Sequence, residues 1–245
     1  MFAGLGLLAA LLFGFAPRPA LAEDTLTVGF STHKPPYVIE ASASGIEVDI
    51  VTEAARAAGF HVVPRFAPMA RLARMVERGE LDAVASTNYG DLAEMHFSEE
   101  YIAYQNYAVA LAARKLPIKT IADLERYSVS TFQRARNLLG PEFSLMANAN
   151  PRYREEADQS VRNRLLLAGR VDVVVGDRRI IEHFNREISA QADTTQALTW
   201  YSLFPPTPYR VGFVKSEWRD RFNAGLASIR KKGAYAATIK RYAAQ

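Results

Sequence analysis

Arg78-Gly79-Glu80-Leu81-Asp82-Ala83-Val84-Ala85 has a counterpart later in the chain, Ala168-Gly169-Arg170-Val171-Asp172-Val173-Val174-Val175. Gly79 aligns with Gly169, and Asp82 with Asp172, at the same offset of 90 residues. Each copy follows a helix-like apolar pattern, ends it at a glycine suited to the position after a helix, and starts a short apolar strand. The pattern predicts two similar α/β lobes, with a cleft between them where a small ligand binds. Helix-glycine-strand junctions occur in any α/β protein, so the repeat alone leaves coincidence open.

Strand and helix patterns alternate along the rest of the chain, as βα units require. Short apolar strands are predicted at 26–30, 61–66, 128–132, 198–203 and 209–213, in addition to the two repeated strands. Helical spacing of apolar residues predicts helices at 46–58, 72–76, 161–166 and 222–229. We expect 209–213 to be the strand on which the chain returns to the first lobe.

The N-terminus predicts a secretory signal peptide, residues 1–22. Leu5 to Phe15 is almost wholly apolar, too short to span a bilayer, and is followed by the small-residue site Ala20-Leu21-Ala22. Cleavage is expected after Ala22, which leaves 223 of the 245 residues for a periplasmic protein. No Lys or Arg precedes the apolar run, so a wrongly assigned start or an uncleaved membrane anchor remains an alternative.

The cysteine content and the charge of the chain exclude several classes of protein. The chain has no cysteine, which excludes disulfides and a lipid-modified N-terminal cysteine. Removing the signal peptide takes away Arg18 and lowers the formal net charge from +4 to +3. Because the basic residues are spread along the chain and form no stripe, nucleic acid is not an expected partner.

A series of short motifs resembles bacterial extracellular solute-binding protein family 3, the periplasmic binding proteins of polar amino-acid ABC transporters. The resemblance implies the type II periplasmic binding protein fold, in which two α/β lobes joined by two crossing strands close on a small polar ligand. It implies a first lobe of residues 23–106 and 208–245, with the second, 107–207, inserted. The motifs, in order, are Pro35-Pro36-Tyr37, Gly45 to Ile50, Gly79 to Ala83, Phe97-Ser98 with Tyr101, Asp123-Leu124, Gly169 to Asp172, and Gly233 to Tyr242.

Two residues match ligand positions of that family. Asp177 follows the second repeated strand, at whose carboxyl end side chains enter the crevice of an α/β sheet, and it matches the aspartate that holds the ligand's ammonium group. Asp177 as the N-cap of the next helix is the alternative. Tyr37 matches the family's aromatic wall, and its alternative is a place in the first lobe's core.

The carboxylate clamp of the family is missing. Relatives carry an arginine in the segment before Phe-Ser, whereas 86–95 holds no arginine and is about three residues shorter. Ser86, Thr87 and Asn88 can still offer hydrogen bonds from the strand end. The sequence therefore departs from the family at the group that would hold a ligand carboxylate.

Three other arginines are candidates to replace the clamp. Arg71 matches the arginine of a Pro-Trp-Lys-Arg variant at the start of a helix beside the cleft, with Met69 in place of the tryptophan. Its alternative is a solvated helix arginine. Arg134 and Arg136 lie where relatives have Gly-Thr, and they favour a ligand with more than one negative group.

Enzyme motifs are weak. Ser31-Thr32-His33-Lys34 matches the Ser-x-x-Lys of penicillin-recognising enzymes, but Pro35-Pro36 prevents the helix that this motif needs. Metal-ligand spacing is absent from the four histidines, His33, His61, His96 and His183. Two alternatives to transport stay open: a periplasmic cyclohexadienyl dehydratase, whose fold the chain resembles, and a ligand sensor for a membrane receptor.

We therefore predict a monomeric periplasmic solute-binding protein, not an enzyme, with no cofactor and no metal. It captures a small polar solute, an amino acid or a related carboxylate, and delivers it to an inner-membrane ABC permease. Closure follows from population shift, because solute contacts from both lobes favour the closed state.

Overall fold

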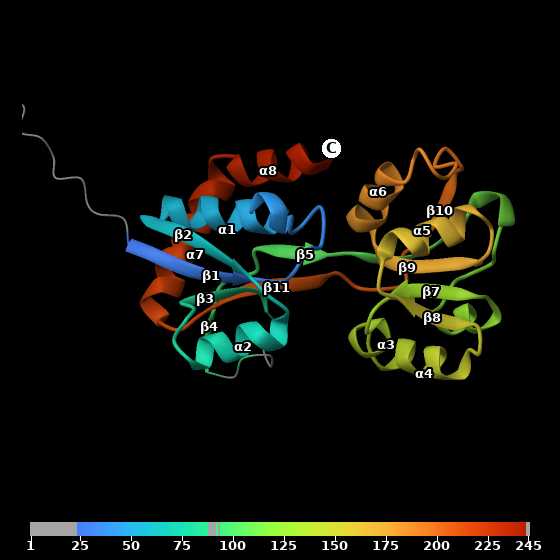
Figure 1. Cartoon of the computed structure of the whole chain (residues 1–245), viewed down its shortest axis with the longest axis horizontal. Helices are drawn as coiled ribbons and strands as arrows, with labels where there is room; N and C mark the ends of the chain where they lie inside the picture. The colour runs from blue at the N-terminus through green and yellow to red at the C-terminus, as the bar shows by residue number, and fades with distance from the viewer. Residues whose placement is uncertain (1–23, 88–91, 93, 244–245) are drawn as a thin grey trace, which may run out of the picture.

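Two sheets with helices packed around them form two lobes that lie side by side (Figure 1). The computed structural model describes residues 24–87, 92 and 94–243. The predicted signal peptide, 1–22, and the candidate Asn88 lie outside these residues. We call the first sheet with its helices the first lobe, and the second sheet with its helices the second lobe.

The first lobe comes from both ends of the chain. Its helices are α1 (Ile46–Ala57), α2 (Met69–Glu77), α7 (Ser216–Lys231) and α8 (Ala234–Ala243). Its strands are β1 (Asp24–Phe30), β2 (Phe60–Phe66), β3 (Ala83–Thr87), β4 (His96–Phe97), β5 (Ile102–Tyr104) and β11 (Thr207–Phe213).

The second lobe comes from the middle of the chain. Its helices are α3 (Ala135–Leu138), α4 (Pro141–Ala149), α5 (Gln159–Leu167) and α6 (Arg178–Glu187). Its strands are β6 (Asn106–Leu111), β7 (Val129–Phe132), β8 (Tyr153–Glu156), β9 (Val173–Asp177) and β10 (Leu198–Tyr201). Short 3-10 helices lie at Ala112–Arg114 and Ala122–Arg126, and another lies in the first lobe at Glu40–Ser42.

Both sheets have the same strand order. The first reads β2-β1-β3-β11 and the second β8-β7-β9-β6. In each, the first three strands are parallel and the fourth is antiparallel to the third. The chain passes between the sheets twice, after β5 and before β11, in the centre of the molecule (Figure 1). The exact lobe limits, 23–106 with 208–245 and 107–207, stay a prediction.

The repeated motif forms the same joint in both lobes. Gly79 and Gly169 have φ angles of 67° and 66°, in the left-handed region that glycine enters without steric cost. The Asp82 carboxylate accepts a hydrogen bond from the backbone N–H of Thr27 at 2.8 Å, and Asp172 accepts one from that of Ser128 at 2.9 Å. The repeated aspartate therefore ties the start of its own strand to the neighbouring parallel strand.

The predicted strands and helices are confirmed. Other elements were not predicted, and β8 and α4 are two of them. Strand β8 reads Tyr-Arg-Glu-Glu and lies at the sheet edge beside β7, so no apolar run in the sequence indicates a strand there. Helix α4 starts with Pro141 directly after Gly140 and has a weakly one-sided apolar pattern. Both elements are held by tertiary contacts that the local pattern does not reveal.

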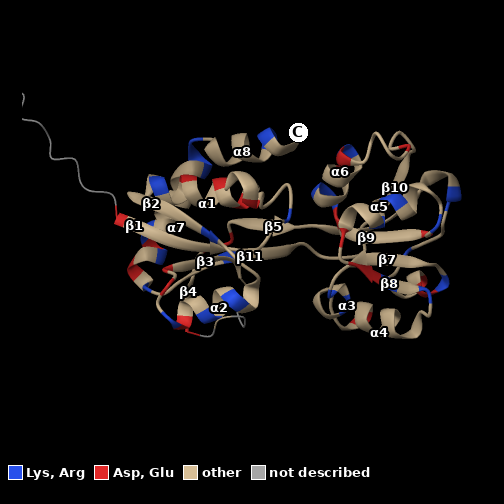
Figure 2. Cartoon of the chain, in the orientation of Figure 1, with Lys and Arg blue, Asp and Glu red and all other residues tan. Residues whose placement is uncertain are grey.

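The lobes touch through the apolar side of α6. Ile180 belongs to the buried cluster of the first lobe that includes Leu26, Phe30 and Tyr37, and Phe184 packs against the same cluster. Basic and acidic residues alternate over both lobes in the view of Figure 2, in keeping with the mild net charge. Across the described residues, no helix combines the length and apolar character needed to cross a membrane.

Candidate functional site

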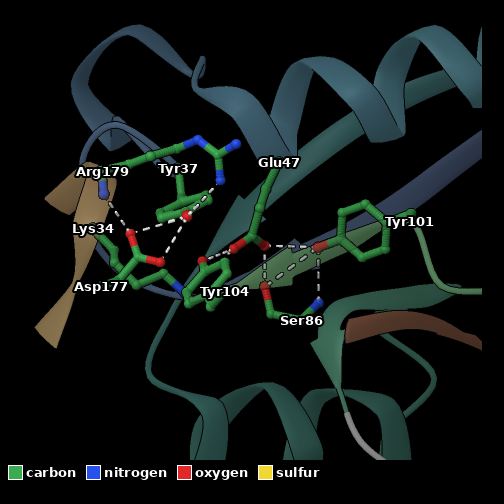
Figure 3. Close-up of polar contacts among 8 residues, drawn as sticks. All are labelled: Lys34, Tyr37, Glu47, Ser86, Tyr101, Tyr104, Asp177 and Arg179. Atoms are coloured by element: carbon green, nitrogen blue, oxygen red, sulfur yellow. Dashed lines mark hydrogen bonds and ion pairs between the residues drawn. The ribbon is translucent and has the colours of Figure 1, made fainter. Parts of the chain in front are cut away.

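Tyr37 of the first lobe meets Asp177 of the second. The Tyr37 hydroxyl lies 3.0 Å from each carboxylate oxygen of Asp177, which accepts its hydrogen bond, although 140 residues separate the two in sequence (Figure 3). Tyr37 is fully buried and Asp177 is 3% exposed. Two residues that the sequence selected separately are therefore joined across the lobes.

The start of α1 fixes the position of Tyr37. Gly45 precedes the helix with a φ of 124°, and a Cβ there would lie 2.3 Å from the carbonyl oxygen of Tyr37. The backbone N–H groups of Ile46 and Glu47 donate to the carbonyls of Pro36 and Tyr37 at 2.9 and 3.0 Å. The loop thus satisfies the open N–H groups of the helix and sets Tyr37 beside Glu47.

Asp177 caps α6, as the alternative interpretation predicted. Its Oδ1 accepts hydrogen bonds from the backbone N–H groups of Arg179 at 2.9 Å and Ile180 at 3.2 Å. Its Oδ2 accepts one from the backbone N–H of Gln105, between the lobes, at 2.9 Å. Burial raises the pKa of Asp177, although the donors from Gln105, Ile180 and Tyr37 act in the opposite direction.

Glu47 is a fully buried acid in the first lobe. It accepts hydrogen bonds from the hydroxyls of Ser86, Tyr104 and Tyr101, the last at 2.7 Å, and its Oε1 lies 3.3 Å from Nζ of Lys34 (Figure 3). Burial acts to raise the pKa of Glu47, but the Lys34 ammonium and the hydroxyl donors outweigh it and hold the pKa below its usual value. Glu47 is therefore a charged and fully partnered carboxylate.

Tyr104 connects the two acids. Its ring stacks on that of Tyr37, with centroids 3.9 Å apart and planes 23° apart, and Lys34 lies 4.5 Å from its centroid. Burial raises the pKa of the Tyr37 and Tyr104 hydroxyls well above the usual value, so both stay protonated and donate. We call Lys34, Tyr37, Glu47, Tyr104, Asp177 and Arg179 the interlobe site.

Two arginines accompany Asp177. Nη1 of Arg179 donates to the Tyr37 hydroxyl at 3.3 Å. Arg162 of α5 is fully buried behind β9, where Nη1 donates to the Val175 carbonyl at 3.4 Å. Burial lowers the pKa of Arg162 to about 10, and the charge of Asp177 opposes this shift.

A pocket of about 290 Å³ lies against the interlobe site. Pro36 and Tyr242 line it from the first lobe, and Asp177, Arg179 and Arg186 from the second. A small organic solute fits a space of this size, and groups of both lobes can reach it. Among the described residues, no three His, Asp or Glu side chains are grouped so that they could hold a metal ion.

Three of the residues predicted to contact the ligand do not line the interlobe pocket: Ser86, Thr87 and Arg71. Ser86 has a φ of 58° and turns its hydroxyl to Glu47. The Thr87 hydroxyl donates to the carbonyl of Arg210 at 3.2 Å. Arg71 is exposed on α2, and its side chain has no hydrogen-bond or ion-pair partner among the described residues. Its geometry matches the alternative of a solvated helix arginine.

Arg134 and Arg136 lie at a different edge of the second lobe. Their backbone N–H groups donate to the Glu155 carboxylate at 2.7 and 3.0 Å, so a group of the chain itself occupies the donors of this turn. The Arg136 side chain donates to Asn148 at 3.0 Å. Burial opposes ionisation of Glu155, but these hydrogen bonds and that of Tyr153 lower its pKa overall. The structure does not bring these arginines to the interlobe pocket.

Sequence reasoning missed Glu47, Lys34, Tyr104, Arg162 and Arg179. A signal existed for Glu47, because it shares the buried face of α1 with Ile50, Val51 and Ala54. An acid within an apolar helix stripe is expected to have a buried partner. For Arg179 and Arg162 the sequence gives no such sign, since both lie among other basic residues.

The model of the family described as bacterial extracellular solute-binding proteins, family 3, matches residues 26–245. None of the curated proteins matches the chain. An ancestral arginine-binding protein bound to arginine is similar in structure, with 20% identity, a TM-score of 0.66, and coverage of 91% of this chain and 99% of that one.

Receptor and sensor domains are similar as well. The GluR0 ligand-binding core in complex with L-glutamate has 17% identity, a TM-score of 0.68, and coverage of 92% of this chain and 99% of that one. A histidine kinase sensor domain with similarity to periplasmic binding proteins has 20% identity, a TM-score of 0.68, and coverage of 90% and 96%. At these identities the likeness shows the fold, which is the predicted type II periplasmic binding protein fold.

Proposed function

Because this chain belongs to the bacterial extracellular solute-binding proteins, family 3, we propose that it binds a small polar solute between its lobes and delivers it to an ABC transporter permease. The observation that carries the proposal is the contact of Tyr37 with Asp177, which joins the lobes beside a pocket of about 290 Å³. Similar structures include an arginine-binding protein bound to arginine and a ligand-binding core in complex with L-glutamate. They support a solute of amino-acid size.

Closure of the lobes is the proposed mechanism. The chain crosses between the lobes only around Gln105 and before β11 within the described residues, so few backbone angles need to change for the lobes to separate. A solute that contacts both lobes favours the closed state by its differential affinity for that state. We place the division at 23–106 with 208–245 and 107–207.

The location and state of the protein follow from the same proposal. A signal peptide cleaved after Ala22 would release a monomeric periplasmic protein that meets its permease at the inner membrane. We assign no catalytic role to any residue. The proposed function needs no cofactor, because binding and closure use side chains and backbone groups alone.

A thermal-shift screen tests the proposal. The mature chain is refolded to remove carried-over solute and heated with amino acids, polyamines, dicarboxylates and aromatic acids including prephenate. A solute at 100 times its dissociation constant adds about 2.7 kcal/mol and raises the melting temperature by roughly 5 °C or more. We expect a hit that is recovered unchanged. Consumption of the hit would instead indicate an enzyme of the cyclohexadienyl dehydratase type.

A ligand sensor is the second candidate, because receptor and histidine kinase sensor domains share this fold. Uptake separates the two candidates. Membrane vesicles that contain the cognate permease should accumulate the identified solute only when the mature protein is added. Solute binding without stimulated uptake would favour sensing.

A further inference from the structure

The two carboxylates of the interlobe site are already saturated with donors. Asp177 accepts hydrogen bonds from the Tyr37 hydroxyl and from three backbone N–H groups, those of Gln105, Arg179 and Ile180. Glu47 accepts from three hydroxyls and pairs with Lys34. An ammonium group of a solute would have to displace these partners, so the site offers it no open acceptor from either acid.

The guanidinium of Arg162 adds a buried positive charge on the protein side of Asp177. Arg162 is fully buried, its hydrogen bonds go to neutral oxygens, and the acid whose charge acts on it is Asp177. Gly176 leaves the space for it, because a Cβ there would lie 2.6 Å from Nη1 of Arg162. The charge of Asp177 is thus balanced within the protein, which weakens its attraction for a cationic solute.

Two arginines offer open donors to the pocket. Arg179 uses one N–H group on Tyr37, and its other N–H groups have no hydrogen-bond acceptor among the described residues. Arg186 lines the same pocket, and its side chain has no hydrogen-bond or ion-pair partner in the described part of the chain. Arg178 is paired with Glu182 at 2.7 Å, so this pair adds no net charge.

Arg179 and Arg186 lie on one face of α6. Seven residues are close to two helical turns, and they separate the two Cα atoms by about 10.5 Å along the axis. Each guanidinium can grip one carboxylate through two parallel hydrogen bonds. Two such grips at this spacing match a solute with a carboxylate at each end.

We propose that the solute of the interlobe pocket is a dicarboxylate without an ammonium group, held by Arg179 at one end and Arg186 at the other. The inference rests on the proposed solute-binding function and names the class of solute. It places the carboxylate grip on the second lobe, in α6, in place of the arginine that is missing from residues 86–95.

Matched pairs of solutes test the inference. Succinate, glutarate and adipate are titrated by calorimetry into the refolded mature chain, and glutarate is compared with L-glutamate, which differs from it by the ammonium group. L-arginine represents the cationic amino acids. We expect at least one dicarboxylate to bind, glutarate to bind more tightly than L-glutamate, and L-arginine not to bind.

Charge-removing variants locate the site. Arg179→Gln and Arg186→Gln should each weaken dicarboxylate binding by about tenfold to a hundredfold, the effect of losing a charged hydrogen-bond pair. Arg126→Gln is the matched control, because its side chain is 71% exposed on the second lobe and lies outside the pocket. It should bind as the unmodified chain does, and thermal melts check that all three variants fold.

The outcomes separate this inference from the proposed function. Binding of L-arginine, or tighter binding of L-glutamate than of glutarate, overturns the dicarboxylate inference and leaves solute binding intact. Dicarboxylate binding that survives both glutamine variants refutes the assigned arginines. If neither these solutes nor the broader thermal-shift panel binds, both the inference and the proposed function fail.

Discussion

The first and second lobes share one scaffold but bury opposite charges at their junction. Glu47 in the first lobe and Arg162 in the second are both fully buried. Glu47 has an ammonium partner and three hydroxyl donors, whereas Arg162 has only amide and carbonyl oxygens at 3.0 to 3.4 Å. A repeated strand order therefore fixes where side chains meet and leaves their charge free to differ.

The two strand ends differ in the same way. At the repeat offset of 90 residues, Ser86-Thr87 of β3 corresponds to Gly176-Asp177 of β9. Ser86 turns its side chain to a buried acid, and Gly176 has no side chain because a buried base occupies that space. Each lobe thus adapts the same position to its own buried charge.

Removing the Glu47 carboxylate should give the largest loss of stability. Glu47→Ala leaves Lys34 without its partner and three buried hydroxyls without an acceptor, so we expect a loss of about 3 to 5 kcal/mol in the free energy of unfolding. Urea denaturation measures it. Glu47→Gln is the control, because it keeps an acceptor oxygen and should lose less; equal losses would show that the hydroxyl network contributes little.

Adding a methyl group beside the buried Arg162 should give the second-largest loss of stability. In Gly176→Ala the new Cβ would meet the Arg162 guanidinium at 2.6 Å, and we expect a loss of up to about 3 kcal/mol from overpacking. Adding Arg162→Met shortens the blocking side chain. Urea melts of the single and double variants should reveal strong coupling, and strictly additive losses would contradict the contact.

Substituting each of the two repeated aspartates should give a smaller loss of stability, and the two losses can be compared. Asp172 accepts from the N–H and the hydroxyl of Ser128 and pairs with Arg114 at 2.6 Å, while Asp82 accepts from Thr27. We expect Asp172→Ala to lose about 2 kcal/mol and Asp82→Ala about 1 kcal/mol in unfolding free energy. A larger loss at Asp82 in urea melts would reverse the comparison.

Asp172 should also shape the response to acid. Burial opposes its ionisation, but the Ser128 donors and Arg114 lower its pKa below the usual value. The ionised group therefore adds stability above the unfolded pKa of about 3.9, and this contribution is lost as the pH falls through the lower folded value. Melts from pH 6 to pH 2 should show a shallower acid destabilisation in Asp172→Asn than in the unmodified chain.

The contact between the lobes should give a change in stability as small as that of Asp82→Ala. Tyr37→Phe keeps the ring stacked on Tyr104 and removes the hydroxyl from Asp177 and Arg179, so we expect a loss of about 1 kcal/mol. Small-angle scattering without solute should show a larger radius of gyration, because closure loses a contact. Tyr127→Phe, with no contact between the lobes, is the control and should leave the radius unchanged.

Much of the site was open to prediction, and the rest was not, for identifiable reasons. Asp177 and Tyr37, which meet between the lobes, were selected because a strand end and a motif order marked them, and their roles as ligand residues stay a prediction. Glu47 was passed over although it shares an apolar helix stripe, and Arg179 is one arginine in the pair Arg178-Arg179, which local pattern cannot tell apart. The local pattern could not show that Arg71 is exposed either, because its exposure on α2 depends on how the helix packs.

The sequence by itself determined the two-lobed α/β fold, because apolar periodicity, glycine positions and the 90-residue repeat are local patterns that survive in one dimension. Tertiary structure alone decided which charges face each other. Tyr37 reaches Asp177, and Arg162 lies behind it, only because strands far apart in the chain end at the same junction. Electrostatic interactions depend on distance in space and on burial, and neither is written in the order of the residues.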